Sequence, residues 1–203
     1  MPKRIQRTAK AIEAAGLKLF AASPVDAVAI DDIVKEADVS KGSFYNHYVD
    51  KSALLDSIVT YVRAGLEAQV NAANMDVGDP AVRIARAISV YAQHALDEPA
   101  STRVLIRVET TGVKMENLLN QGLIGDVSKG MAEQRFSICS LEAGVLMVAG
   151  ITRIIVARIS ERPESSDARP LTLQMCAMLL HGFGVGQSEA QAIATKSVQF
   201  VMG

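Results

Sequence analysis

Apolar residues recur at intervals of three and four along most of the chain, which is the spacing of amphipathic helices. The pattern predicts three short helices and a long fourth one, over residues 5–22, 30–37, 40–47 and 50–72. Ser23-Pro24 ends the first helix, whereas Ser40 and Asp50 are good N-caps for the third and fourth. A short helix, a tight turn and a second short helix packed on a first helix form the helix-turn-helix plan.

The rest of the chain predicts six or seven further helices and no β-hairpin. Asp79-Pro80 joins an N-cap to a proline at the first helical position. The segment Ser188 to Gln191 has the pattern of a capping box. The expected ranges are 80–97, 101–110, 115–133, 140–160, 171–182 and a last helix from 188. The fold class is therefore all-α.

Composition adds limits on the class of protein. The chain has 203 residues, of which 49% are hydrophobic, so it can bury a substantial core. Two scattered cysteines make no disulfide framework, and no secretory signal is seen, so we expect a cytoplasmic protein. The longest apolar run, 143–151, is too short to span a bilayer, and no membrane partner is expected. The net charge is −1, although residues 1–10 are basic and carry no acid.

The third short helix combines a buried face with a polar one. Phe44 and Tyr48 lie four residues apart and can pack inward. The opposite face offers hydrogen-bond donors, acceptors and a flat ring, which is what contacts to bases and phosphates require. Lys51 follows the Asp50 cap and would add a phosphate contact. The predicted DNA-binding residues are Lys41, Gly42, Ser43, Tyr45, Asn46, His47 and Lys51, together with Arg4 and Arg7 of the basic N-terminal arm.

The run from Ile12 through Leu55 resembles the N-terminal domain of tetR-family (tetracycline-repressor-like) transcriptional regulators. The resemblance is carried by the motifs Val39-Ser40-Lys41-Gly42, Phe44-Tyr45, His47-Tyr48 and Leu54-Leu55. It implies a DNA-binding domain over 1–50 and an effector-binding and dimerisation domain over 51–203. By position, it also places the DNA contacts of the family on the residues from Lys41 to Lys51 given above.

Three departures from the family pattern affect the expected phosphate contacts. Pro24 stands where glycine is common, and Val28-Ala29 replaces a threonine-rich pair that could cap the second helix. Asp38 stands at the usual glycine of the turn. Since aspartate is among the residues that tolerate a positive φ, we expect the turn to survive at a modest cost.

The helix at 140–160 is apolar nearly all round, which predicts burial on two sides. One side can face its own domain and the other a second subunit, as can the helix at 171–181. A two-fold dimer would present two reading helices to a palindromic DNA site. The predicted interface consists of Leu141, Val145, Val148, Thr152, Ile155, Ile159, Met175 and Met178, with Gly144 and Gly150 permitting close approach.

The expected function is that of a ligand-responsive homodimeric repressor. The helix at 40–47 would bind a palindromic operator, and a small molecule of unknown identity in the C-terminal domain would release it. The candidate pocket residues are Tyr91, His94, Arg107, Thr111 and Met147. The alternative is a DNA-binding dimer without an effector, which would have a packed C-terminal domain with no cavity of a few hundred Å3.

Other classes of function have little support in the sequence. No metal-protease, hydrolase or P-loop motif occurs, so no catalytic residue, metal site or cofactor is predicted. A redox sensor would need Cys139 or Cys176, and apolar neighbours on both sides argue for unreactive thiols. The chain is therefore expected not to be an enzyme.

Overall fold

The computed structural model describes residues 3–108, 121–164 and 166–203, with side chains from Gln6 onward. Within these ranges the chain forms ten α-helices, a short 3-10 helix and no strand. The helices are α1 (Lys3–Ala22), η1 (Val25–Ala27), α2 (Ile30–Glu36), α3 (Lys41–Tyr45), α4 (Lys51–Ala73), α5 (Pro80–Asp97), α6 (Pro99–Val108), α7 (Gln121–Ala132), α8 (Leu141–Glu161), α9 (Ala168–Gly182) and α10 (Gln187–Met202). The prediction of an all-α fold is confirmed.

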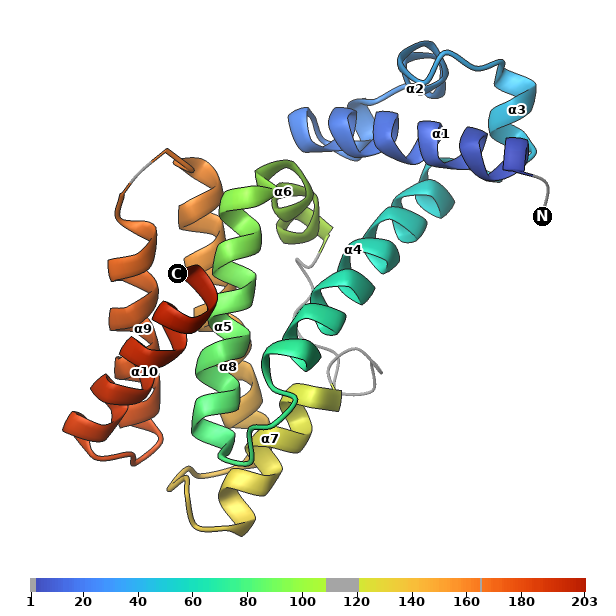
Figure 1. Ribbon diagram of the computed structural model, residues 1–203. Coiled ribbons are helices and arrows are strands. Elements are labelled where there is room, and N and C mark those ends of the chain that lie inside the picture. The colour runs from blue at the N-terminus through green and yellow to red at the C-terminus, as the bar shows by residue number, and fades with distance from the viewer. Residues whose placement is uncertain (1–2, 109–120, 165) are drawn as a thin grey trace.

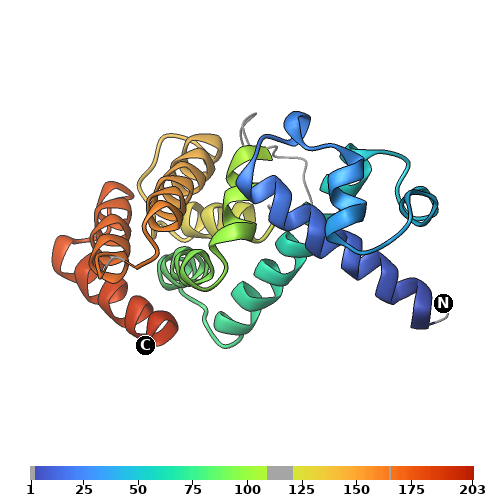
Figure 2. The ribbon, with the colours of Figure 1, turned by 90° about the horizontal axis from the view of Figure 1, so that it is seen from above.

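The helices form two groups that α4 connects. Helices α1, α2 and α3 lie together at one end of the molecule, and α5 to α10 form a bundle at the other (Figure 1). Helix α4 starts beside α1 and runs diagonally down to α5, so that one continuous helix belongs to both groups. Seen from above, the first group projects to one side of the bundle (Figure 2).

The N-terminal group has its own apolar core. Ile12, Ile33, Phe44 and Leu54 have no exposed surface, so that residues from four helices meet there. Gly16 allows α1 and α4 to approach closely, because a Cβ atom on it would lie 2.8 Å from Leu54 Cδ2. The four helices therefore form a unit with little freedom to slide.

A polar contact reinforces this core. Glu13 of α1 accepts hydrogen bonds from the Tyr48 hydroxyl at 2.9 Å and the Ser57 hydroxyl at 2.8 Å. Burial, and then the hydrogen bond to Glu13, raise the pKa of Tyr48 to about 12. Tyr48 is thus neutral over the physiological pH range. Its hydrogen bond to Glu13 holds the chain that follows α3 against α1.

The turn between α2 and α3 has the expected strained residue. Asp38 has φ of 52°, in the left-handed region. Its N–H donates to the Lys35 carbonyl at 3.3 Å, and the Val39 N–H donates to the Val34 carbonyl at 3.0 Å. This is the Schellman arrangement that usually uses glycine. The prediction that aspartate sustains the turn is confirmed.

Helix α2 begins without a side-chain cap. Its N-cap is Ala29, which has no acceptor to offer the first N–H groups of the helix. Only the reverse half of a capping box is present, since Asp32 Oδ2 accepts from the Ala29 N–H at 3.4 Å. The hydroxyl whose absence was noted in the sequence is therefore missing as a side-chain cap of α2.

The C-terminal bundle is built around α5, which contacts every one of α4, α6, α7, α8, α9 and α10. Its inward residues, Ile84, Ala85, Ile88, Ala92 and Ala95, are at most 1% exposed. Helix α8 is long and apolar enough to cross a membrane by length and composition, with a mean hydropathy of 1.7. Because α5, α6, α7 and α9 pack against it, we describe it as a core helix of the bundle.

The start of α10 differs from the sequence prediction. The helix begins at Gln187 after the N-cap Gly186, with no side-chain cap. Ser188 therefore lies inside the first turn, and the predicted capping box is wrong. The chain turns into the helix two residues early because Val185 is buried, at 2% exposure, and its N–H donates to the Leu180 carbonyl.

A hydroxyl at position 29 should stabilise the N-terminal group of helices, α1 to α3 with the start of α4, which we call the reading domain. Ala29 has extended backbone angles and an exposed side chain, so serine fits there without strain. We expect Ala29→Ser to raise the free energy of unfolding by about 1 kcal/mol, measured by urea denaturation. Ala29→Val, which adds bulk but no acceptor, is the control. Equal stability of the two variants would contradict the capping argument.

Candidate DNA interface and effector cavity

Helix α3 divides its side chains as the aromatic spacing predicted. Phe44 is fully buried and Tyr48 is 9% exposed, whereas Tyr45 is 50% exposed. Lys41, Gly42 and Asn46 are also exposed, and Ser43 and His47 are half-buried at the edges. Ser40 caps the helix, because its Oγ accepts from the Ser43 N–H at 3.1 Å. Six of the predicted DNA contacts therefore lie on one accessible surface.

Lys41 is paired in the absence of DNA. Its Nζ lies 2.7 Å from Asp31 Oδ1 of α2, and both side chains are largely exposed. The hydrogen bond to Asp31, and then the charge of Asp31, raise the pKa of Lys41, which is therefore fully charged at neutral pH. A phosphate would have to compete with this carboxylate, although an exposed pair is held only weakly in water.

Lys51 has a different place from the one the sequence suggested. Its Nζ donates to the backbone carbonyls of Val28 at 2.6 Å, Val25 at 3.0 Å and Asp26 at 3.3 Å. The ammonium group thus uses its three donors on the loop around η1. We correct the prediction of a phosphate contact, because Lys51 binds η1 to the start of α4 instead.

The basic N-terminal arm is only partly described. Arg7 lies on α1 with an exposed side chain. The side chain of Arg4 lies outside the described residues. The arm continues α1 past the core, so Arg7 is accessible to a partner on the side where α1 begins.

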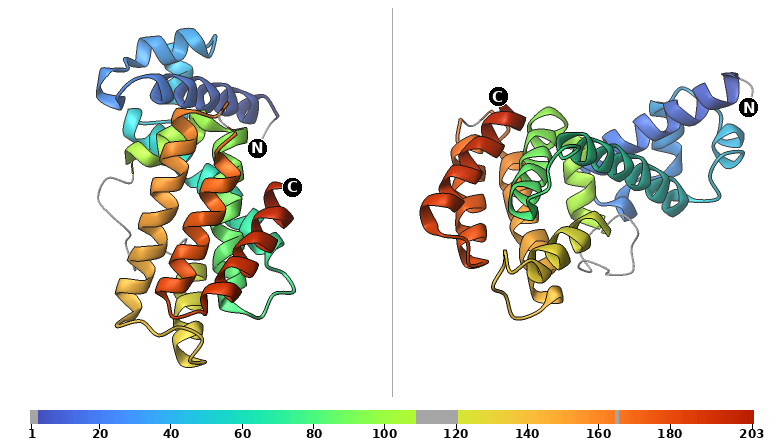
Figure 3. Two further views of the ribbon diagram at one scale, coloured as in Figure 1. Left: turned by 90° about the vertical axis from the view of Figure 1, so that its left-hand side faces the viewer. Right: turned by 60° about the horizontal axis from the view of Figure 1, so that its bottom comes forward.

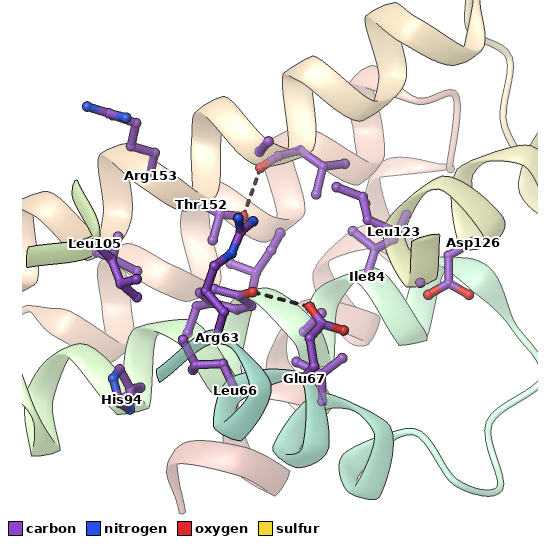
Figure 4. A pocket seen from close by; sticks show the side chains of 18 of the residues that line it. Arg63, Leu66, Glu67, Ile84, His94, Leu105, Leu123, Asp126, Thr152 and Arg153 are labelled. Carbon is purple, nitrogen blue, oxygen red and sulfur yellow. Dashed lines mark hydrogen bonds between the residues drawn. The ribbon is translucent and has the colours of Figure 1, made fainter. Parts of the chain in front are cut away.

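A cavity of about 150 Å3 lies between α4, α5, α6, α7 and α8. Its walls are mainly apolar (Figure 4). Apolar residues from each of the five helices line it, among them Leu66, Ile84, Leu105, Leu123 and Val156. It is smaller than the few hundred Å3 we expected for an effector site, so only a small molecule fits without rearrangement.

Two charged residues of α4 enter this cavity one helical turn apart. Arg63 and Glu67 extend from α4 into it, and the Tyr91 hydroxyl donates to Glu67 Oε1 at 3.5 Å (Figure 4). Burial raises the pKa of Glu67, while the hydrogen bond from Tyr91 and the charge of Arg63 act in the opposite direction. The sequence analysis missed both α4 residues, since charged side chains on a long helix usually face solvent.

Most other polar groups of the cavity are already paired. Arg83 Nε donates to Asp126 Oδ1 at 2.5 Å, and Arg153 donates to the Ile106 carbonyl at 3.0 Å. The Thr152 hydroxyl donates to the Val148 carbonyl. In Figure 4 the Arg153 side chain points away from the side chains gathered around Glu67. These groups shape the wall: Asp126 balances the charge of Arg83, and the guanidinium of Arg153 donates to a backbone carbonyl.

Thr102 and His94 lie at the α5–α6 side of the cavity. Burial lowers the pKa of His94, so its ring is neutral. His94 Nε2 lies 2.8 Å from Ser101 Oγ. Because the Ser101 hydroxyl donates its proton to the Glu98 carbonyl, Nε2 of His94 must be the donor in the hydrogen bond to Ser101. Thr102 is 3% exposed, and its Oγ1 has no hydrogen-bond partner among the described residues. A buried hydroxyl of this kind is uncommon and marks a place where a ligand could supply the partner.

The candidate pocket residues separate into three groups. Tyr91 and His94 line the cavity. Met147 is 43% exposed on the outside of α8, and Arg107 does not reach the cavity, so neither is retained as a pocket residue. Thr111 lies outside the described residues.

Arg107 instead connects the two groups of helices. Its guanidinium donates to the carbonyls of Phe20 at 2.6 Å and Ser23 at 3.1 Å, at the end of α1. The last carbonyls of a helix have no partner within the helix, so a cation there is favourable. Val104 of α6 is 2% exposed and is part of the N-terminal core. Helix α6 is thus a second attachment of the N-terminal group.

The predicted dimer stripe of α8 is buried in its own chain. Val145, Val148, Ile155 and Ile159 are at most 4% exposed and belong to the bundle core. Gly144 is internal too, because a Cβ on it would lie 2.5 Å from Ile138 Cδ1. These residues are accessible to no partner, so their assignment to an interface is corrected. Leu141, Thr152 and Met175 are half-buried, and only Met178 is exposed.

The other stripe of α8 is the accessible one. Exposed apolar side chains on it and on α9 are Leu146 (45%), Met147 (43%), Ile154 (62%) and Met178 (68%). A Cβ atom added to Gly150 would meet nothing within 4 Å. A Cβ atom added to Gly182, one turn beyond Met178 on α9, would lie 3.4 Å from Met147 Cε of α8. Helices α8 and α9 pack against each other and lie side by side in the left view of Figure 3, so we assign these exposed side chains to one apolar face.

The cysteines are free, and only one of them has an inert environment. Cys176 is buried, and this burial raises the pKa of its thiol to about 12. Cys139 is exposed, in contrast to the apolar packing we expected for both. No cluster of histidine, cysteine and acidic residues suited to a metal ion occurs in the described ranges.

The site therefore combines a helix-turn-helix, which has an exposed polar helix, with a helical bundle that holds a cavity. Residues 12–58 match the sequence model of the "Bacterial regulatory proteins, tetR family". The match covers the N-terminal group of helices and the start of α4, in agreement with the resemblance seen in the sequence. No curated protein matches the chain.

Solved structures with the same fold extend over the whole chain. RolR in complex with the ligand resorcinol is 21% identical, with a TM-score of 0.62 and coverage of 97% of both chains. A gamma-butyrolactone receptor (ArpA-like protein) is 15% identical, with a TM-score of 0.70 and coverage of 98% of this chain and 99% of that one. A tetR-family protein from Shewanella sp. PV-4 is 15% identical, with a TM-score of 0.73 and coverage of 86% and 96%. At these identities the likeness establishes the fold alone. The chain has the fold of the tetR-family transcriptional regulators.

The contrast between Lys51 and Lys41 is testable. We expect Lys51→Met to lower the free energy of unfolding by about 1–2 kcal/mol, since three carbonyls lose a charged donor. Lys41→Met should leave the urea midpoint unchanged, because its only described ion pair is exposed. If Lys51→Met had the same urea midpoint as the parent, the ammonium group of Lys51 would not be structural and would be available to DNA.

Proposed function

We propose that this protein is a ligand-responsive homodimeric transcriptional repressor of the cytoplasm. The segment 40–47 binds a palindromic operator, and a small molecule bound in the C-terminal domain releases it. The DNA-binding domain covers residues 1–50 and the effector-binding and dimerisation domain residues 51–203. The DNA contacts are Lys41, Gly42, Ser43, Tyr45, Asn46 and His47, with Arg4 and Arg7 of the N-terminal arm.

The observation that carries this proposal is that α4 belongs to both the reading domain and the cavity. Leu54 and Ile58 pack in the N-terminal core, whereas Leu66 and Glu67 line the cavity. Leu54 and Glu67 are separated by about 20 Å along a single helix. A ligand that shifts the lower half of α4 would therefore change the angle of the reading domain. Typical couplings of about 1–3 kcal/mol are enough to alter operator occupancy several-fold or more.

Dimerisation is supported by the apolar face of α8 and α9. Met147, Ile154 and Met178 are too exposed to contribute to the fold of one chain, and Gly150 leaves room for a close approach. Two copies of this face would form a four-helix contact around a two-fold axis. Such a dimer presents two copies of α3, and an operator of two half-sites roughly 34–36 Å apart fits them.

An effector-free DNA-binding dimer is the second candidate. It is favoured by the cavity volume of about 150 Å3, which falls below the few hundred Å3 expected of an effector site. Against it stand the half-buried Glu67 and the buried Thr102 hydroxyl, which has no hydrogen-bond partner among the described residues, in the wall of that cavity. Buried polar groups of this kind have a cost in a domain that only needs to pack.

Selection from random duplexes tests the proposal most directly. The full chain is incubated with the pool at fixed salt, and the bound DNA is sequenced, because phosphate contacts make affinity depend on salt. A palindromic consensus with half-sites about one helical turn apart is the expected result. Enrichment of single, unpaired half-sites would refute the dimeric reader, and no enrichment by folded protein would refute sequence-specific reading.

Removal of one aromatic ring should separate folding from DNA reading. Tyr45 is half exposed and has only an edge contact with Phe44, at 5.5 Å between ring centroids. We expect Tyr45→Ala to weaken operator binding tenfold or more, measured by fluorescence anisotropy, because a reading contact is lost. Tyr61→Ala removes an even more exposed ring from α4 and is the control. Equal affinities of the two variants would remove Tyr45 from the interface.

A charge on the exposed stripe of α8 should dissociate the dimer. Ile154 is 62% exposed in one chain and would be buried between two. We expect Ile154→Asp to sediment as a monomer at concentrations where the parent is a dimer, since two unpaired carboxylates would have to be buried. Met75→Asp, at a 79% exposed position outside this face, should stay dimeric. A dimeric Ile154→Asp protein would show that the interface lies elsewhere.

A further inference from the structure

The cavity beside α4 restricts the chemistry of its ligand in three respects: size, charge and hydrogen bonding. Its volume is about 150 Å3, and its walls are mainly apolar. Apolar protein cavities of about this volume hold a molecule of the size of benzene. A ligand of two fused rings would need the surrounding helices to move apart, at the cost of packing in the bundle core.

Three arginines and two carboxylates line the cavity, and each carboxylate has an arginine close by. Arg83 is paired with Asp126, and Glu67 has Arg63 one turn away on α4. His94 is neutral because burial lowers its pKa. Arg153 is directed away from the centre of the cavity, toward the Ile106 carbonyl (Figure 4). A ligand anion would meet the Glu67 carboxylate, and a ligand cation would meet Arg63, so a neutral ligand is favoured.

Two polar groups of the wall have hydrogen-bonding capacity to spare. Glu67 Oε1 accepts from the Tyr91 hydroxyl at 3.5 Å, which is a long and weak hydrogen bond. The carboxylate is partly removed from water, so a further donor would stabilise it. The Thr102 hydroxyl, at 3% exposure, has no partner among the described residues. A hydroxylated ligand supplies what both groups lack.

We propose that this cavity binds a neutral molecule the size of a single six-membered ring, with a hydroxyl group that donates a hydrogen bond to Glu67. A second hydroxyl or ring substituent would meet Thr102. The inference rests on the proposed function, because it takes this cavity as the effector site. Since Glu67 lies on α4, the residue that selects the ligand also lies on the helix that carries the reading domain.

Binding of small probe molecules to the full chain tests the inference. The probes are phenol, toluene, benzoate, benzylamine and 2-naphthol, and calorimetry gives each dissociation constant. Phenol should bind more tightly than toluene, benzoate or benzylamine, which lack the hydroxyl or carry a charge. The larger 2-naphthol should bind more weakly than phenol. Tighter binding of 2-naphthol, or of either charged probe, would overturn the size or the charge requirement.

Variants of Glu67 locate the binding site. Glu67→Ala should weaken phenol binding about tenfold or more and leave toluene binding unchanged, because only the hydroxyl loses its acceptor. Glu67→Gln keeps an acceptor oxygen and should remain within a few-fold of the parent. Glu161→Gln, at an exposed carboxylate of α8, is the matched control. Unchanged phenol affinity in folded Glu67→Ala would overturn the assignment.

Operator binding with and without phenol separates this inference from the proposed function. If benzoate or benzylamine binds best and weakens operator binding, the ligand class is wrong while the regulatory function stands. If phenol binds through Glu67 and the operator affinity does not change, the ligand class stands and effector-controlled release fails. Failure of all probes to bind would overturn the inference and favour the effector-free dimer, whose DNA binding is measured independently.

Discussion

The continuity of α4 through two apolar cores is the constraint on which the rest of the structure depends. Its 23 residues begin beneath the reading domain and end in the bundle. At the upper end, Gly16 brings α1 so close to Leu54 that the two helices cannot slide without overpacking. At the lower end, Leu66 is 1% exposed and Glu67 lines the cavity. An uninterrupted helix curves only gently, so a shift of its lower half is transmitted to its upper half.

The sequence predicted the reading domain well because its signals are local. Phe44 and Tyr48 are four residues apart, so they must share a face, and the remaining side chains of α3 have to point outward. Asp38 could be assigned a positive φ because the family resemblance places it at the usual glycine of the turn. Lys51 shows the limit of this reasoning: its carbonyl partners lie 23 to 26 residues earlier, and no local pattern indicates that they approach its ammonium group.

The bundle was harder to predict, because its helices carry ambiguous patterns. Helix α8 has two apolar stripes, and composition does not tell which one faces the core. Packing decides this: Val145 and Ile155 meet α5 and its neighbours, and Ile154 is left outside. Arg107 was a candidate pocket residue, but the carbonyls of Phe20 and Ser23 at the end of α1 are its partners. Such contacts between distant helices depend on tertiary geometry.

The two attachments of the reading domain differ in how easily they yield. The contact of α1 with α4 is apolar and closely packed, so breaking it would open a cavity in the core. The contact with α6 includes the Arg107 hydrogen bonds to Phe20 and Ser23, and water can replace them because Ser23 is partly exposed. Exchanging such bonds has a net cost of about 1 kcal/mol each. A displacement of α4 should therefore move α1 along with it, while the Arg107 hydrogen bonds between α6 and the end of α1 break. Because Leu105 and Ile106 of α6 line the same cavity as Glu67, a ligand bound there would contact both the rigid attachment and the yielding one.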